Sequence, residues 1–174
     1  AEAQEKPLPL ASFNLCELIR LVLITRIQQL EEKNIQVVTS FDQDDLYALG
    51  VRDQIEQVLI NLLDNAIRFT PTGGRISISV HEQSKKSLAI TVADNGLGIL
   101  PEDADKIFDR FYKADHSHTP GEGVGLGLAI VKAILERHGQ GIQLLPTQEG
   151  AAFRFTLDSA REGSGRQHAV ESPR

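Results

Sequence analysis

The stretch Asp94-Asn95-Gly96-Leu97-Gly98-Ile99 sets the architecture expected for this chain. It follows the run Leu88-Ala89-Ile90-Thr91-Val92-Ala93, whose alternating β-branched residues predict a strand. The two glycines that follow an acidic residue let the backbone approach a flat ligand, because no Cβ intervenes. A buried carboxylate only accepts hydrogen bonds, so its natural partner is an exocyclic amine such as N6 of adenine. Taken alone, the stretch is also compatible with a plain turn after a strand.

The composition of the 174 residues restricts the class of protein. With 41% hydrophobic residues, the chain is long enough to fill the core of one domain. No apolar run approaches the length of a membrane span and no signal peptide is visible, so we expect no direct membrane contact in this chain. We expect a cytoplasmic domain whose parent protein is anchored in the membrane by a part that this chain does not show. The formal net charge of -6 gives no basic footprint for a nucleic acid. The single cysteine, Cys16, excludes an internal disulfide and favours a packing role over a reactive thiol.

The hydrophobic pattern predicts strands and helices that alternate without regular βαβ spacing. The predicted strands cover residues 35–41, 46–51, 75–81, 88–93, 142–145 and 151–157, and the predicted helices cover residues 15–33, 52–69 and 123–138. Asn14 is a candidate N-cap of the first helix, and Gly139 is expected to end the third. Residues 100–121 hold a short helical piece around 102–111 before a polar loop, which is a length typical of a lid. We expect an α/β two-layer sandwich with a mixed sheet of about five strands on three helices.

Composition also predicts the limits of the domain. Residues 1–14 are polar and contain Pro7 and Pro9, so we expect a linker that arrives from upstream. Residues 15–158 are the expected folded domain, and residues 159–174 are rich in Gly, Ser and charge and predict a disordered tail. The absence of Met, with Ala1 as first residue, suggests a piece of a longer protein.

A polar stripe on the second predicted helix is a candidate ligand site. Asn61, Asn65 and Arg68 are spaced four and three residues apart, so they share one face of the helix. Gln54 and Gln57 extend this stripe. Asn is a poor helix former, and a neutral amide oxygen suits Mg²⁺, which takes much of its shell from water and phosphates. Arg68 is a candidate phosphate partner, and the alternative for the whole stripe is a solvated polar face.

Glycines and basic residues supply two further candidates. Gly121-Glu122-Gly123-Val124-Gly125-Leu126-Gly127 leads into the third predicted helix, and exposed N–H groups at a helix start bind anions. The spacing is neither a Walker A motif nor the dinucleotide fingerprint, because no Gly-Lys-Ser/Thr follows and Leu128 replaces the third glycine. In Ile107-Phe108-Asp109-Arg110-Phe111-Tyr112-Lys113, the two phenylalanines suggest an anchoring face for the lid. Arg110 and Lys113 are candidate phosphate partners.

Four motifs therefore follow one another: Asn61-Leu62-Leu63-Asp64-Asn65-Ala66, then residues 94–99, then Phe108 to Lys113, then Gly123 to Lys132. Their order and gaps resemble the N, G1, F and G2 boxes of sensor histidine kinases, over about residues 8–158. The resemblance implies the Bergerat ATP-binding fold, which gyrase-type and chaperone-type ATPases share. It also implies ATP and Mg²⁺ as cofactors.

The resemblance assigns roles to residues of this chain. The implied nucleotide-binding residues are Asn61, Asn65, Arg68, Phe69, Asp94, Gly96, Gly98, Ile99, Lys113, Gly123, Val124, Gly125, Leu126 and Gly127. Asp94 would accept a hydrogen bond from the adenine amine, and Asn65 would hold Mg²⁺. The implied catalytic set is Asn61, Asn65, Arg68 and Lys113.

Several positions depart from the family pattern. Arg68 stands where the family usually has Lys, Phe69 where it often has Tyr, and Val51 where it often has Asp. Arg keeps the charge but offers a fork in place of a point charge, whereas Phe loses a hydroxyl contact. Asn61 stands where related ATPases carry a Glu general base, and an amide takes no proton near neutral pH. We therefore expect a site that holds ATP without rapid hydrolysis and transfers the γ-phosphoryl group to another nucleophile.

The resemblance also implies partners. In the family, a histidine on a preceding dimerisation domain accepts the phosphoryl group, and a response regulator receives it afterwards. The histidines of this chain (His81, His116, His118, His138 and His168) do not lie in that setting, so we expect the acceptor on a separate domain and this domain as a monomer. His116 and His118 also raise a metal site, although solvation is favoured because no third ligand is near. The alternatives are a gyrase- or chaperone-type ATP-driven clamp, an anti-sigma serine kinase, and a docking module that has lost nucleotide binding.

Overall fold

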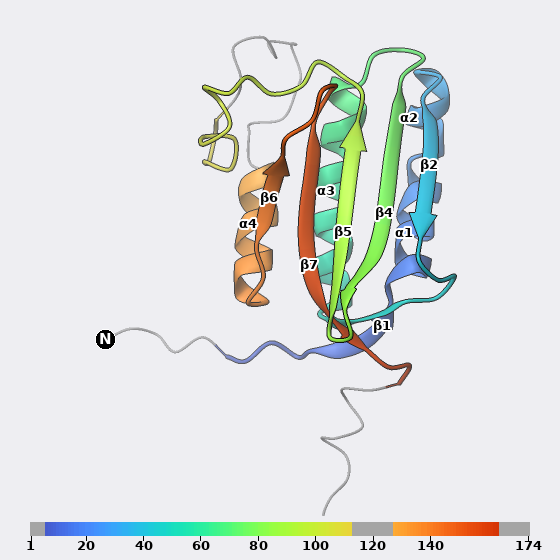
Figure 1. The fold of residues 1–174 in the computed structure, drawn as a ribbon, viewed down its shortest axis with the longest axis vertical. Coiled ribbons are helices and arrows are strands. Elements are labelled where there is room, and N and C mark those ends of the chain that lie inside the picture. The colour runs from blue at the N-terminus through green and yellow to red at the C-terminus, as the bar shows by residue number, and fades with distance from the viewer. Residues whose placement is uncertain (1–5, 113–126, 164–174) are drawn as a thin grey trace, which may run out of the picture.

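The chain forms a seven-stranded mixed sheet with a layer of helices on one face (Figure 1). The computed structural model describes residues 6–112 and 127–163. The elements in order are β1 (Ala11–Asn14), α1 (Leu15–Thr25), α2 (Ile27–Glu32), β2 (Gln36–Phe41), β3 (Tyr47–Gly50), α3 (Arg52–Phe69), β4 (Arg75–Ser84), β5 (Ser87–Asp94), α4 (Gly127–Arg137), β6 (Ile142–Leu145) and β7 (Ala152–Ala160). The predicted α/β two-layer sandwich with a mixed sheet is confirmed.

The strand order places β5 in the middle of the sheet. The order is β1-β3-β7-β5-β4-β2, and β6 pairs with the other part of β7. Only β2 and β4 pair in parallel, which makes the sheet mixed. Asp94 lies opposite Ile76 of β4, and Ala93 lies opposite Ala152 of β7. The end of β5 is therefore enclosed by a strand on each side.

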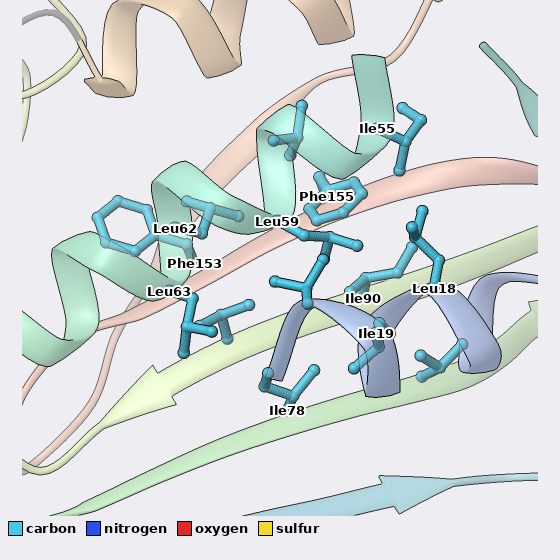
Figure 2. Close-up of a cluster of buried hydrophobic side chains, with 14 of the residues drawn as sticks. Leu18, Ile19, Ile55, Leu59, Leu62, Leu63, Ile78, Ile90, Phe153 and Phe155 are labelled. Atoms are coloured by element: carbon cyan, nitrogen blue, oxygen red, sulfur yellow. The ribbon is translucent and has the colours of Figure 1, made fainter. Parts of the chain in front are cut away.

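One face of the central strands is apolar and packs on the helices (Figure 2). The core residues occupy every second position along these strands, because successive side chains of a strand point to opposite faces of the sheet. They are Ile76, Ile78 and Val80 of β4, Leu88, Ile90 and Val92 of β5, and Phe153, Phe155 and Leu157 of β7. The predicted apolar stripe of α3 meets them with Ile55, Val58, Leu59, Leu62, Leu63, Ala66 and Ile67, all of which are buried. The opposite face of the sheet carries half-buried polar residues such as Ser77, Thr91 and Thr156.

The structure corrects the expected limits of the sheet. Residues 11–14 form β1 and pair antiparallel with β3, so this part of the expected linker belongs to the sheet. Phe13 explains the difference, because its side chain is buried in the core. At the other end, β7 continues to Ala160 and includes two residues of the expected tail. The strand predicted over 142–145 is confirmed as β6, and with β1 added the sheet has seven strands where about five were expected.

The structure also corrects two expected helices. The helix predicted over 15–33 is divided at Arg26, whose backbone (φ -112°, ψ 9°) leaves the helical range. The Asn14 side chain caps α1 as predicted, by accepting the Glu17 N–H at 3.1 Å. The piece around 102–111 is a series of turns rather than a helix, with bonds such as Lys106 N–H to Asp103 O at 2.9 Å. No helix in the described ranges is long and apolar enough to cross a membrane.

Two basic side chains tie α2 to α3. At the start of α2, the Arg26 guanidinium contacts both carboxylate oxygens of Asp64, at 2.6 and 3.2 Å. At its end, Lys33 Nζ donates to the carbonyl oxygens of Ile67 at 2.7 Å and Arg68 at 3.4 Å. These carbonyls lie in the last turn of α3, where a helix lacks internal donors and a cation is favourable. Lys33 therefore holds the turn of α3 that carries Arg68.

We expect Lys33→Met to lower the free energy of unfolding by about 1–2 kcal/mol, because it leaves α3 carbonyls without a charged donor. Urea denaturation followed by circular dichroism measures this change. The control is Lys85→Met in the exposed turn between β4 and β5, which we expect to change stability by less than about 0.5 kcal/mol. Equal effects of the two substitutions would contradict the assigned role of Lys33.

Candidate active site

Asp94 is a buried acid at the end of β5. Its residue is 9% exposed, although carboxylates are seldom so deeply placed. The backbone N–H of Gly96 donates to Asp94 Oδ1 at 2.9 Å, which makes a local turn that fixes the carboxylate. The backbone N–H of Asp94 donates to Ala151 O at 2.9 Å and ties the site to the start of β7.

Burial raises the pKa of Asp94 above its ordinary value, because the charged form loses hydration. The backbone N–H groups of Gly96 and Ala151 oppose this rise, since they stabilise the carboxylate. A carboxylate has about four acceptor positions, so these donors leave capacity for a ligand. The site can therefore accept a hydrogen bond from a polar group of a ligand.

Glycines allow three segments to converge around Asp94. A Cβ on Gly96 would overlap the carbonyl oxygen of Phe69, at the end of α3. A Cβ on Gly150 would overlap the backbone carbonyl of Asp94, and Gly150 has a φ of +64° that other residues rarely adopt. A Cβ on Gly98, at φ +77°, would meet Gly150 O at 3.0 Å. The end of α3, the end of β5 and the turn before β7 thus meet without intervening side chains.

Sequence reasoning missed Gly150 and Ala151 as members of this site. The signal was a glycine directly before the predicted strand 151–157, which a turn also explains. Only the pairing of β5 with β7 brings that turn beside Asp94.

The polar stripe of α3 extends from the same junction. Asn61 and Asn65 are half-buried, and Arg68 is exposed. The Arg68 guanidinium carbon lies 5.3 Å from the ring centroid of Phe69, in a cation–π contact. The side-chain N–H of Asn61 donates to Gly127 O at 3.3 Å and connects α3 to the start of α4. A Cβ on Gly127 would meet none of the atoms of residues 6–112 and 127–163 within 4 Å.

The segment after the acidic turn is anchored by one phenylalanine rather than two. Phe108 packs edge-on against Phe153, with ring centroids 6.0 Å apart, and Ile107 is buried beside the core. Phe111 is 66% exposed, so its predicted part in the anchoring face is wrong. Tyr112 donates a hydrogen bond to Asp103, which joins the end of the segment to its beginning.

The structure brings together part of the predicted site. Asp94 and Gly96 meet the end of α3, Gly98 lies against Gly150, and Ile99 is half-buried against the core. Five predicted residues lie outside the described residues: Lys113, Gly123, Val124, Gly125 and Leu126. His116 and His118 lie there too. Residues 6–112 and 127–163 hold no group of three His, Cys, Asp or Glu that could bind a metal, so a cation here would depend on amide and ligand oxygens.

A buried acid beside close main-chain contacts, with an amide-bearing helix next to it, suits the binding of a nucleotide. Residues 50–161 match the family model of histidine kinase-, DNA gyrase B-, and HSP90-like ATPases, and the chain belongs to this family. Within the family, it is the ATP-binding catalytic domain of a sensor histidine kinase.

Relatives and solved structures agree with this placement. The chain is 35% identical over 144 residues to the sensor histidine kinase WalK of Bacillus subtilis, covering 81% of this chain and 24% of WalK. It is 32% identical over 168 residues to the sensor histidine kinase Hik2 of Synechocystis, covering 89% of this chain and 39% of Hik2. The chain thus spans well under half the length of these relatives. The nucleotide-free catalytic domain of histidine kinase ThkA superposes with a TM-score of 0.77 at 32% identity, covering 87% of this chain and 99% of that one. ThkA has also been solved in complex with the response regulator protein TrrA.

We expect Gly96→Ala to lower the free energy of unfolding by about 1–3 kcal/mol, because the added methyl group overlaps the Phe69 carbonyl. We also expect it to weaken ATP binding, since Asp94 must move with the turn. Thermal unfolding and ATP titration calorimetry measure the two effects. Gly141→Ala is the control, because a Cβ there meets nothing within 4 Å. A Gly96→Ala protein as stable as this control would refute the close approach.

Proposed function

We propose that this domain binds Mg²⁺ with ATP and transfers the γ-phosphoryl group to a histidine on a separate domain of its parent protein. The observation that carries the proposal is the buried Asp94 carboxylate, held where β5 meets the last turn of α3. An acceptor in that position suits the exocyclic amine of adenine. Gly96 and Gly98 are proposed to shape the pocket for the flat purine, and ATP supplies the phosphoryl group.

We place the phosphates along the polar face of α3. The carboxamide oxygen of Asn65 is the proposed Mg²⁺ ligand, because a hard cation prefers oxygen and keeps part of its water shell. Arg68 is proposed to contact phosphate oxygens with its planar fork. Its position in the last turn of α3, which Lys33 supports, suits that role. We also propose phosphate contacts for Lys113 and the glycines before α4, and for these residues the proposal rests on the sequence motifs alone.

The surroundings of Asn61 support slow hydrolysis of ATP. Its side-chain oxygen accepts a hydrogen bond from Gln57 at 2.7 Å, and an amide takes no proton near neutral pH. Asn61 therefore does not activate water as a general base. Phosphoryl transfer depends mainly on positioning and charge neutralisation, which this helix face supplies. The lack of a general base at Asn61 favours a kinase over an ATP-driven clamp, because a clamp must activate water.

The partners are proposed from the relatives. Because ThkA forms a complex with a response regulator, we propose that a response regulator receives the phosphate from the parent protein of this domain. The acceptor histidine is proposed to lie on a dimerisation domain that precedes β1 in the parent protein. We also propose that the domain acts in the cytoplasm and is monomeric in isolation.

The direct test mixes this domain with a dimerisation-domain fragment of a sensor kinase, Mg²⁺ and γ-labelled ATP. We expect acid-labile, base-stable label on the fragment, as phosphohistidine requires. The chain carrying Asn65→Ala should transfer at least tenfold less, because loss of a metal ligand leaves the phosphate charge uncompensated. Rapid release of labelled phosphate without any label on the fragment would support the clamp instead.

We expect Asp94→Asn to weaken ATP binding at least tenfold, because a buried donor facing the adenine amine costs about 1–3 kcal/mol. Without nucleotide, the same substitution should stabilise the protein at neutral pH. The raised pKa of Asp94 means that ionisation costs stability as pH rises from the unfolded-state pKa through the folded-state pKa. The difference in stability between variant and wild type should therefore shrink as pH falls through that window. Thermal unfolding across pH and calorimetric titration measure both effects, and unchanged ATP affinity would refute the pocket.

A further inference from the structure

Gln57 and Asn61 form a hydrogen-bonded pair on the exposed face of α3. They are one turn apart, and Gln57 Nε2 donates to Asn61 Oδ1 at 2.7 Å. Asn61 in turn donates through Nδ2 to Gly127 O at 3.3 Å. Gln57 is exposed and Asn61 is half-buried, so the pair lies at the surface rather than in the core. The chain of contacts runs from α3 to the glycine that begins α4.

We propose that Gln57 is a positioning residue that fixes which end of the Asn61 amide faces the nucleotide phosphates, an inference that rests on the proposed function. The two ends of a carboxamide have nearly the same shape, but one accepts hydrogen bonds and the other donates two. The donor group of Gln57 engages the Asn61 oxygen, so the amino group of Asn61 is directed to the start of α4. One N–H is used by Gly127 O, and the second remains for a phosphate oxygen.

This arrangement separates the roles of the two asparagines of α3. Asn61 has its oxygen engaged, so it acts as a donor and not as a metal ligand. Within the described ranges, the Asn65 side chain forms no hydrogen bond, so its oxygen is available to a cation. A carboxylate is a better Mg²⁺ ligand than an amide but cannot donate a hydrogen bond. Substitution by Asp therefore distinguishes the two roles.

The contact lies at one end of an antiparallel helix pair whose other end is tied independently. The backbone N–H of Val51, at the start of α3, donates to His138 Nε2 at 3.1 Å, just beyond α4. His138 Nδ1 lies 2.8 Å from Ile134 O, which fixes the tautomer with the proton on Nδ1. Loss of Gln57 therefore leaves α3 and α4 joined, and its effect is local to Asn61.

The test compares Gln57→Leu, which removes the donor, with Gln57→Glu, which at neutral pH only accepts and so reverses the Asn61 amide. Gln54→Glu is the matched control, because it adds the same charge one turn earlier on α3 without contact to Asn61. In the nucleotide-free domain, we expect the Asn61 side-chain amide signals in ¹⁵N NMR spectra to shift in both Gln57 variants and not in the control. We expect Mg²⁺-ATP affinity to fall about 3- to 10-fold for Gln57→Leu, more than 10-fold for Gln57→Glu, and less than 2-fold for the control.

A second pair of variants tests the separation of roles. We expect Asn65→Asp to keep Mg²⁺-dependent ATP binding within about 5-fold of wild type, and Asn61→Asp to lose it at any Mg²⁺ concentration. Unchanged Asn61 signals in Gln57→Glu, equal losses in Gln57→Glu and Gln54→Glu, or tighter Mg²⁺ binding in Asn61→Asp would each overturn the inference. A wild-type domain that binds no ATP would instead refute the proposed function, while the nucleotide-free spectra would still report on Gln57.

Discussion

The architecture depends on the close approach of the backbone at Gly96 to the carbonyl oxygen of Phe69. This contact joins the central strand of the sheet to the last turn of α3, and it exists only because Gly96 has no Cβ. The hydrophobic core brings the two layers together, but it does not fix the ends of their elements with this precision. The Asp94 carboxylate and the amide-bearing helix α3 meet at one junction as a result.

The second constraint is the set of polar ties that fix α3. Lys33 supports its last turn, the Arg26–Asp64 pair holds its middle, and the contact of Val51 with His138 holds the N-cap residue that precedes its first turn. Each tie uses side chains or backbone groups from the surface of the helical layer. The apolar face of α3 sets its distance from the sheet. These ties fix the rotation of α3 about its own axis and its position along that axis. Functional side chains on the opposite face therefore occupy fixed positions.

Much of this fold follows from local pattern, and α3 begins and ends at the residues predicted from its apolar stripe. The errors come from interactions that pattern does not encode. The break at Arg26 coincides with a tertiary contact to Asp64, and β1 places Phe13 in the core. The place of Gly150 in the site depends on strand pairing across about 55 residues of chain, which no local window contains. The four-residue spacing of Gln57 and Asn61 is visible in the sequence, but only the structure shows which of the two amides donates the hydrogen bond.

The contacts of the Asp94 junction are made largely by main-chain atoms, and this has a consequence for inhibitor design. An inhibitor that hydrogen bonds to the acid and stacks along the glycine turn would contact few side-chain atoms, and only side chains are changed by point mutation. Replacing Gly96 or Gly150 would displace the backbone of the junction itself. Under the role proposed for Asp94, replacing the acid would remove its hydrogen bond to adenine. If the proposed site is correct, drug resistance by point mutation at this junction would carry a fitness cost, and escape would have to arise from residues nearer the phosphates.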